Sequence, residues 1–119
     1  ARPIGLRSYA PLFPDLLELK AQQFVLEFAN REMAEADLWQ RFPNDRELAA
    51  GVVDVKNHII EPVETLAERI RLLLKYVKPE KLSLVPDCGF SQTPRFLAFP
   101  KLRNLVQAAE LVRAELHGA

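Results

Sequence analysis

Three short apolar runs, separated by longer amphipathic stretches, constrain the fold of this chain more than any other feature of its sequence. They occupy residues 23–29, 48–55 and 81–86. Continuous apolar runs of this length are typical of strands buried on both faces, as in a parallel sheet covered by helices. Periodicity alone cannot distinguish such runs from buried helix, but their shortness and the punctuating residues around them favour strands.

The stretches between and after these runs predict helices. Residues 62–77 and 101–116 place their apolar side chains at the i, i+3, i+4, i+7 spacing of one helical face. Shorter helices are predicted over residues 11–20 and 34–41. Alternation of helices with strands predicts a parallel sheet with right-handed crossovers.

Two architectures contain such a sheet: a small doubly wound α/β domain, and part of a (β/α)8 barrel. A whole barrel takes roughly 250 residues, whereas this chain has 119. As a barrel segment, residues 1–119 would supply only the last three parallel strands with their helices, as a C-terminal fragment of a single domain. The composition does not choose between the two architectures.

The composition does exclude several classes of protein. Basic and acidic residues number 16 each, so no net field draws the chain to nucleic acid or to a charged membrane surface. No apolar run approaches the roughly 20 residues of a membrane-spanning helix, and the first residues lack both a secretory signal and an initiator methionine, which indicates an internal start. The single cysteine, Cys88, excludes an intrachain disulfide and fits a cytoplasmic protein. No dinucleotide-binding, P-loop or serine-hydrolase motif occurs.

Polar residues stand out at the carboxyl ends of the predicted strands, where the loops of parallel α/β folds converge on ligands. Glu27 lies inside the first strand, and Cys88 follows the third. Asp54 and Lys56 lie at the end of the second. A carboxylate in an apolar strand is costly to bury unless it is paired or ligated. Because carboxylate and thiolate are both zinc donors, Glu27 and Cys88 are candidate ligands of one metal ion.

Each of these residues also has an interpretation without chemistry. Glu27 could form an ion pair with Arg31 or Lys56. Cys88 could be a small buried hydrophobe, as most free cysteines are. Asp54 and Lys56 alternate along one strand, so they could share a face and form a salt bridge with each other.

Four stretches carry a family resemblance: LEFANRE, GVVDVKNHIIEPVETLAERIRLLLKYVKPEKL, LVPDCGF and PKLRNLVQAAELVR. With their surroundings, residues 9–116, they resemble the C-terminal barrel of cobalamin-independent methionine synthase and its shorter methyltransferase-like relatives. The resemblance implies a partial (β/α)8 barrel and a zinc ion held by Glu27 and by Cys88 of the PDCG motif. The remaining ligands would be the histidine and cysteine of an H-x-C motif, expected just upstream of this chain, since residues 2–9 resemble the stretch that follows that motif.

The resemblance also implies a reaction and its small-molecule partners. Zinc would stabilise the thiolate of homocysteine, which attacks the methyl group of methyltetrahydrofolate or a related donor and gives methionine. The departing nitrogen needs a proton, which the family supplies from a histidine whose position Lys56 occupies here. We therefore predict Lys56 as a catalytic residue and Asp54 as a substrate-binding one. The lysine also leaves open a relative that alkylates another thiol, such as coenzyme M.

Two further alternatives remain open from the sequence. One is a metal-free barrel like that of uroporphyrinogen decarboxylase, and the other is a non-catalytic interaction or assembly module. Three strands leave two sheet edges with unpaired N–H and C=O groups. We therefore expect the chain alone to be inactive, with its edges covered by the rest of the barrel or by other copies.

Overall fold

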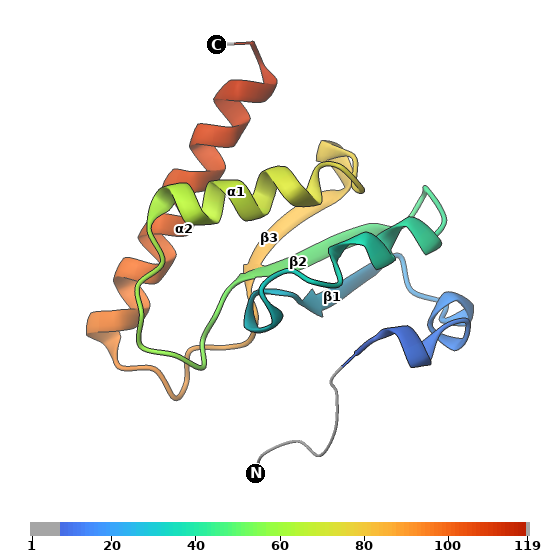
Figure 1. Cartoon of the computed structure of the whole chain (residues 1–119), viewed down its shortest axis with the longest axis horizontal. Coiled ribbons are helices and arrows are strands. Elements are labelled where there is room, and N and C mark those ends of the chain that lie inside the picture. Colours follow the sequence, from blue (N-terminus) through green and yellow to red (C-terminus); the bar gives the residue numbers. More distant parts are fainter. Residues whose placement is uncertain (1–7, 119) are drawn as a thin grey trace.

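The centre of the molecule is a parallel sheet. The computed structural model describes residues 8–118, so nearly all of the stretch predicted to follow the H-x-C motif lies outside the described residues. The sheet contains strands β1 (Gln23–Glu27), β2 (Glu47–Val53) and β3 (Leu82–Pro86) in the order β1-β2-β3 (Figure 1). β1 and β3 both pair with β2 in parallel. The prediction of three adjacent parallel strands is confirmed.

Two strands end earlier than the apolar runs predict. β1 stops at Glu27, because the chain turns there into a short 3₁₀ helix, Ala29–Arg31. β2 stops at Val53, because the Asp54 N–H donates to the side chain of Glu61, 2.8 Å away, instead of joining the ladder. The loops at this edge of the sheet therefore begin before the predicted strand ends.

Two α-helices follow β2 and β3. Helix α1 (Val63–Leu73) lies within the predicted range 62–77. Helix α2 (Arg95–Leu116) begins at Arg95 rather than at residue 101, and it contains Pro100. Proline in a helical pattern usually marks the first turn, but here the turn ahead of Pro100 is helical as well, because its Leu97 is buried in the packed interior.

The helix predicted over residues 11–20 is wrong. Two 3₁₀ helices, Ala10–Leu12 and Asp15–Glu18, occupy this stretch. Pro14 lies between them and has no backbone N–H to donate, so one continuous α-helix does not form. The helix predicted over residues 34–41 is also a 3₁₀ helix.

The helices cover one face of the sheet (Figure 1). On this face Phe24 of β1 packs against Trp39 of the 3₁₀ helix Ala36–Arg41 and against Phe42. Val25, the next residue of β1, points to the other face and is 65% exposed. A doubly wound sheet carries helices on both faces, whereas the wall of a barrel carries them only outside. The observed layers are those of a barrel wall.

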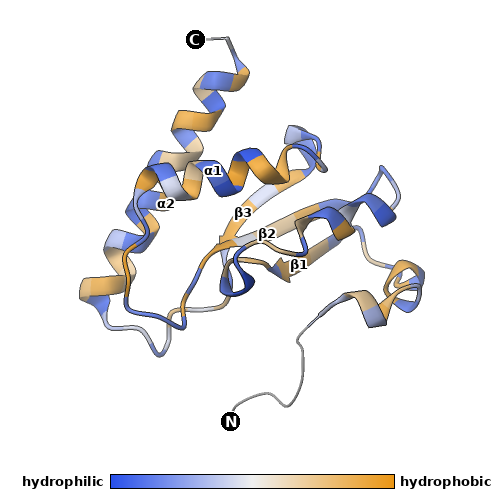
Figure 2. Cartoon of the chain, in the orientation of Figure 1, coloured by the Kyte–Doolittle hydropathy of each residue, from blue (hydrophilic) through white to orange (hydrophobic). Residues whose placement is uncertain are grey.

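Hydrophobic and hydrophilic residues alternate along α2 (Figure 2), and several of its apolar side chains are exposed. The large ones are Phe96, Phe99, Leu102, Val106, Leu111 and Leu116. Phe99, Leu102 and Val106 line one shallow hollow, and exposed apolar surface gathered in this way is typical of a packing face. A short 3₁₀ helix, Pro79–Lys81, leads into β3 and completes the elements of the described part. Among residues 8–118 no helix has both the length and the apolar character needed to span a membrane.

Candidate functional site

The carboxyl edge of the sheet brings together the loops that carry the candidate site residues. Glu27 is the last residue of β1, Asp54 directly follows β2, and Cys88 follows β3. Because the strands are parallel and in close register, their carboxyl ends lie at the same edge. The structure thus groups the loops of Glu27, Lys56 and Cys88 at one edge, as their positions after the strands predict.

Glu27 carries a partly exposed carboxylate that faces two neighbouring side chains. Its Oε2 lies 3.2 Å from Asn30 Nδ2, which donates a hydrogen bond, and 3.8 Å from Lys56 Nζ. The alternative ion pair with Lys56 is therefore present. The pair with Arg31 is not, because the guanidinium of Arg31 binds the carboxylate of Glu35 instead.

Cys88 is a free and exposed cysteine. The interpretation of this residue as a small buried hydrophobe is wrong, because Cys88 is exposed although its neighbour Asp87 is buried. An accessible thiol can lose its proton and ligate a metal ion. Within residues 8–118, no three histidine, cysteine, aspartate or glutamate side chains are grouped closely enough to hold a metal ion. Glu27 and Cys88 would thus supply only part of a tetrahedral set.

Asp54 and Lys56 do not form the salt bridge with each other that their alternation allows. Asp54 Oδ1 accepts the backbone N–H of Lys56 at 2.8 Å, and its Oδ2 accepts Asn57 Nδ2 at 2.9 Å. The Asp54 carboxylate therefore shapes its own loop, because β2 has already ended and these N–H groups need acceptors. The Lys56 ammonium is free to reach across to Glu27.

Asp87 is a residue of the site that the sequence did not single out. Its carboxylate is buried and accepts three backbone N–H groups that follow β1, those of Phe28 at 3.2 Å, Ala29 at 3.1 Å and Asn30 at 2.7 Å. These bonds fix the segment after Glu27 to the residue before Cys88. Its position directly after β3 is visible in the sequence, but its partners lie 57 to 59 residues away and meet it only in the fold.

The setting of Asp87 is tight and weakly polar. Burial raises the pKa of its carboxyl to about 6, the N–H groups of Ala29 and Asn30 oppose this, and the nearby charges of Glu27 and Asp54 add to it. Gly51 of β2 makes room for the carboxylate, because a Cβ there would lie 2.4 Å from Asp87 Oδ1 and 2.8 Å from Asp87 Cα. Glycine at this position is thus a requirement of the close approach between β2 and the β3 loop.

A second buried polar cluster lies beside the β2 loop. Glu61 accepts hydrogen bonds from the Asp54 N–H, from Arg69 at 2.9 Å and from Lys101 Nζ at 2.9 Å. Burial acts to raise the pKa of Glu61, but these hydrogen bonds outweigh it and hold the pKa below its ordinary value. No feature of the sequence had indicated a role in the site for Glu61, Arg69 or Lys101.

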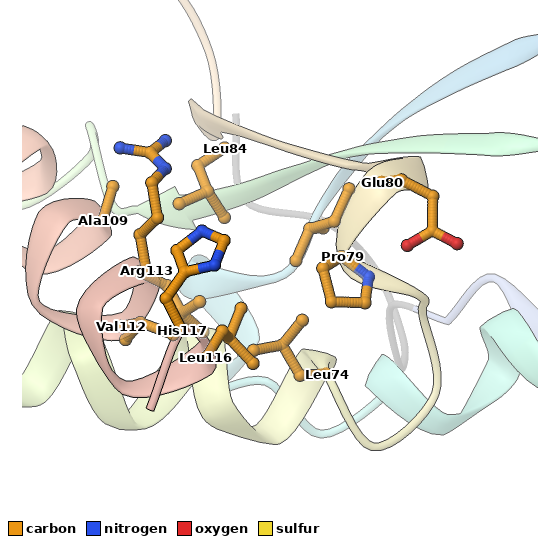
Figure 3. Close-up of a pocket in the computed structure, with 11 residues that line it drawn as sticks. Leu74, Pro79, Glu80, Leu84, Ala109, Val112, Arg113, Leu116 and His117 are labelled. Atoms are coloured by element: carbon orange, nitrogen blue, oxygen red, sulfur yellow. The ribbon is translucent and has the colours of Figure 1, made fainter. Parts of the chain in front are cut away.

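An apolar cavity lies away from this edge. It has a volume of about 480 Å³ and is lined by residues of α1, of the segment before β3 and of the last turns of α2 (Figure 3). Leu82 at the amino end of β3 forms part of its wall. The cavity therefore belongs to the opposite end of the sheet and is not part of the candidate site.

The fold and the site define a class of protein, namely the wall of a (β/α)8 barrel that presents a carboxylate, an ammonium and a thiol at the carboxyl edge of its strands. The sequence model of the family described as "Cobalamin-independent synthase, Catalytic domain" matches residues 7–111. The chain belongs to this family, that of the cobalamin-independent methionine synthases, and its three strands are part of such a barrel.

Individual relatives agree with this assignment. The chain is 46% identical to a methionine synthase of Pyrococcus horikoshii over 99 residues, which is 83% of this chain and 29% of that protein. It is 43% identical to a methionine synthase of Sulfolobus acidocaldarius over 109 residues, covering 92% of this chain and 32% of that protein. The chain thus spans about a third of the length of these relatives.

A solved structure is similar as well. The B12-independent methionine synthase from Shewanella sp. W3-18-1, in complex with selenomethionine, superposes with a TM-score of 0.84 at 29% identity. The match covers 93% of this chain and 32% of that chain. The partial barrel predicted by the family resemblance is therefore correct, and the doubly wound alternative is not.

Proposed function

We propose that this chain is part of a zinc-dependent methyltransferase that transfers a methyl group to the thiol of homocysteine and so forms methionine. One observation carries the proposal: in a chain of the cobalamin-independent methionine synthase family, the Glu27 carboxylate and the exposed Cys88 thiol lie on loops at one edge of a barrel wall. The Shewanella neighbour, solved with selenomethionine, supports a site for a methionine-like product.

Glu27 and Cys88 have the chemistry that zinc requires. Zinc binds carboxylate oxygen and thiolate sulfur in tetrahedral sets, and a catalytic site keeps one position for the substrate. Asp87 fixes the loops of both residues to each other through its three backbone hydrogen bonds. The other ligands are proposed to be the histidine and cysteine of the H-x-C motif. When bound, zinc lowers the pKa of a thiol substrate, so that its thiolate persists near neutral pH.

Lys56 is proposed to supply a proton. In the transfer the thiolate sulfur forms a bond to the methyl carbon, the bond from that carbon to the donor nitrogen breaks, and the electron pair stays on the nitrogen, which takes up a proton. The Lys56 ammonium lies 3.8 Å from Glu27 Oε2 and is half-exposed, so it lies beside a proposed zinc ligand and can be reached from solvent. We propose methyltetrahydrofolate or a related compound as that donor.

Asp54 stays a proposed substrate-binding residue. Its carboxylate already accepts the Lys56 N–H and the Asn57 side chain, and both contacts hold it at the edge of the sheet. A carboxylate in this place suits a positively charged group such as the amino group of an amino-acid substrate. The same proposal places the reaction in the cytoplasm, where the thiols of the substrate and of Cys88 stay reduced.

The proposal is tested in a complete barrel that contains this chain. Cys88→Ala should abolish zinc retention and homocysteine methylation together, because it removes the thiolate ligand, and Glu27→Ala should weaken both. Ser91→Ala, an exposed change on the same loop, is the matched control and should leave zinc content and turnover unchanged. Stoichiometric zinc in the Cys88→Ala protein would contradict the ligand assignment. Turnover with coenzyme M but not with homocysteine would leave the proposed zinc chemistry in place and show that the acceptor thiol is a different one.

A further inference from the structure

A lysine without any solvent exposure lies beneath the loop between β2 and α1. The side chain of Lys101, from α2, is 0% exposed. Its Nζ lies 2.6 Å from the carbonyl oxygen of Ile59, 2.9 Å from that of Asp54 and 2.9 Å from Glu61 Oε1. An ammonium has three N–H groups, so these acceptors satisfy it fully. A buried ammonium is expensive unless it is paired in this way.

The acceptors of Lys101 belong to one loop. Residues 54–61 join the end of β2 to the start of α1, and Lys101 binds the loop at its beginning, near its middle and at its end. It also lies 3.5 Å from Asn57 Oδ1, the oxygen that accepts the Ile59 N–H. Because carbonyl groups turned inward need a donor, the Lys101 ammonium satisfies the carbonyl groups of Asp54 and Ile59 that this loop shape turns toward it.

The cluster is held in place from the other side as well. The Asp54 N–H, Lys101 and Arg69 all donate to Glu61, and these hydrogen bonds hold its pKa below the ordinary value although burial acts to raise it. Arg69 in turn donates to the carbonyl oxygen of Val52, the residue next to the end of β2, at 2.6 Å. The loop is therefore tied to β2, to α1 and to α2 at once.

We propose that Lys101 is a positioning residue whose ammonium serves as an internal cation for the loop 54–61 and so sets the places of Asp54 and Lys56 at the site. The geometry calls for lysine rather than arginine. Three acceptors converge on one point from different directions, which suits a compact ammonium, whereas the planar guanidinium needs acceptors in its plane and more room. The catalytic consequence rests on the proposed function above, and the effect on the loop does not.

The first test measures the loop itself by amide hydrogen exchange in the complete protein that carries this chain. Lys101→Met keeps the length of the stem but removes the charge, so exchange in peptides covering residues 54–61 should accelerate by about tenfold or more. Peptides of β1 and β3 should change much less. Arg103→Met removes a positive charge from an exposed place on the same helix, and it should leave the loop as it is. Loop exchange in Lys101→Met equal to that of the Arg103→Met control would overturn the proposal.

The second test measures the consequence for the site. In Lys101→Met, kcat should fall by about tenfold or more with zinc content unchanged, because Lys56 loses its place while the loops of Glu27 and Cys88 keep theirs. Lys101→Arg should show a similar loss of kcat, because the planar guanidinium does not fit three acceptors that converge on one point. If Lys101→Met does not fold, Lys101→Gln replaces it, since it keeps a neutral donor in the same space. Should the wild-type protein lack methyl transfer altogether, the proposed function fails while the exchange result still decides the role of Lys101. If the loop exchanges faster in Lys101→Met while kcat stays normal, Lys101 does not position the site.

Discussion

Two buried carboxylates hold the two sides of the candidate site, in opposite electrostatic settings. Asp87 receives only neutral backbone N–H groups, and burial raises its pKa to about 6. Glu61 accepts the Asp54 N–H and is also flanked by the cations Lys101 and Arg69, and these contacts together hold its pKa below the ordinary value. The comparison teaches that the β1 and β3 loops are joined by backbone hydrogen bonds to one carboxylate in a closely packed place, whereas the β2 loop is joined by charged side chains as well as by a backbone hydrogen bond. The two sides should therefore respond differently to substitution.

The largest expected effect comes from removing Glu61, the carboxylate that holds the β2 loop through charged partners. Glu61→Ala leaves two cations without their carboxylate, one of them fully buried, and should lower the free energy of unfolding by about 3–5 kcal/mol. Chemical unfolding of the complete protein measures this. Glu64→Ala on the first turn of α1 is the control, because Glu64 pairs with Arg71 at the surface and should cost about 1 kcal/mol or less. Equal losses in the two variants would show that the buried cluster is no stronger than a surface pair.

On the other side, where Asp87 joins the β1 and β3 loops, the most sensitive position is Gly51. A methyl group there would meet Asp87 Oδ1 at 2.4 Å and the Asp87 backbone at 2.8 Å. Gly51→Ala should therefore cost about 1–3 kcal/mol and loosen the segment after Glu27, which amide exchange of residues 28–30 would report. Gly89→Ala is the matched control, because a Cβ at Gly89 has no neighbour within 4 Å, and its effect should stay within about 0.5 kcal/mol. An unchanged unfolding midpoint in Gly51→Ala would mean that β2 and the β3 loop can move apart freely.

A smaller effect is the pH dependence of the stability that Glu61 contributes. The pKa of Glu61 is lowered in the folded protein from its ordinary value of 4.5, so its contribution to stability is present above that value and is lost as pH falls through the folded pKa. The difference in unfolding free energy between wild type and Glu61→Gln should stay constant from neutral pH down to about pH 5 and shrink below pH 4.5. Thermal unfolding across this range checks the prediction. A gap that grows toward acid would contradict the charged description of this side.

The smallest effect on stability is expected at Lys56. Its ion pair with Glu27 is long, at 3.8 Å, and its side chain is half-exposed, so Lys56→Met should change the free energy of unfolding by less than about 1 kcal/mol. As a proton donor, however, its loss should lower kcat by about 10²–10⁴, with the zinc content preserved. Unchanged turnover and an unchanged pH profile would return Lys56 to the status of a surface ion pair.

The sequence by itself determined the strands, their direction and the edge at which the site residues lie. These follow from local signals, since apolar runs of strand length and helical periodicity depend on neighbours within one or two turns. Glu27 and Cys88 stood out because a carboxylate and a thiol at the ends of apolar strands are unusual, and the PDCG stretch carried the family resemblance. Their roles as ligands stay predictions.

The tertiary structure alone decided what holds those residues in place. Asp87 reaches the Asn30 N–H across 57 residues of sequence, and Lys101 reaches the Asp54 carbonyl across 47. No periodicity reports such partners, because they meet only after the parallel strands and α2 have packed. In the sequence Lys101 belongs to an ordinary helical run, and burial alone shows it to be an internal cation. The failed helix over residues 11–20 has a local cause instead, because the missing N–H of Pro14 outweighed the apolar pattern.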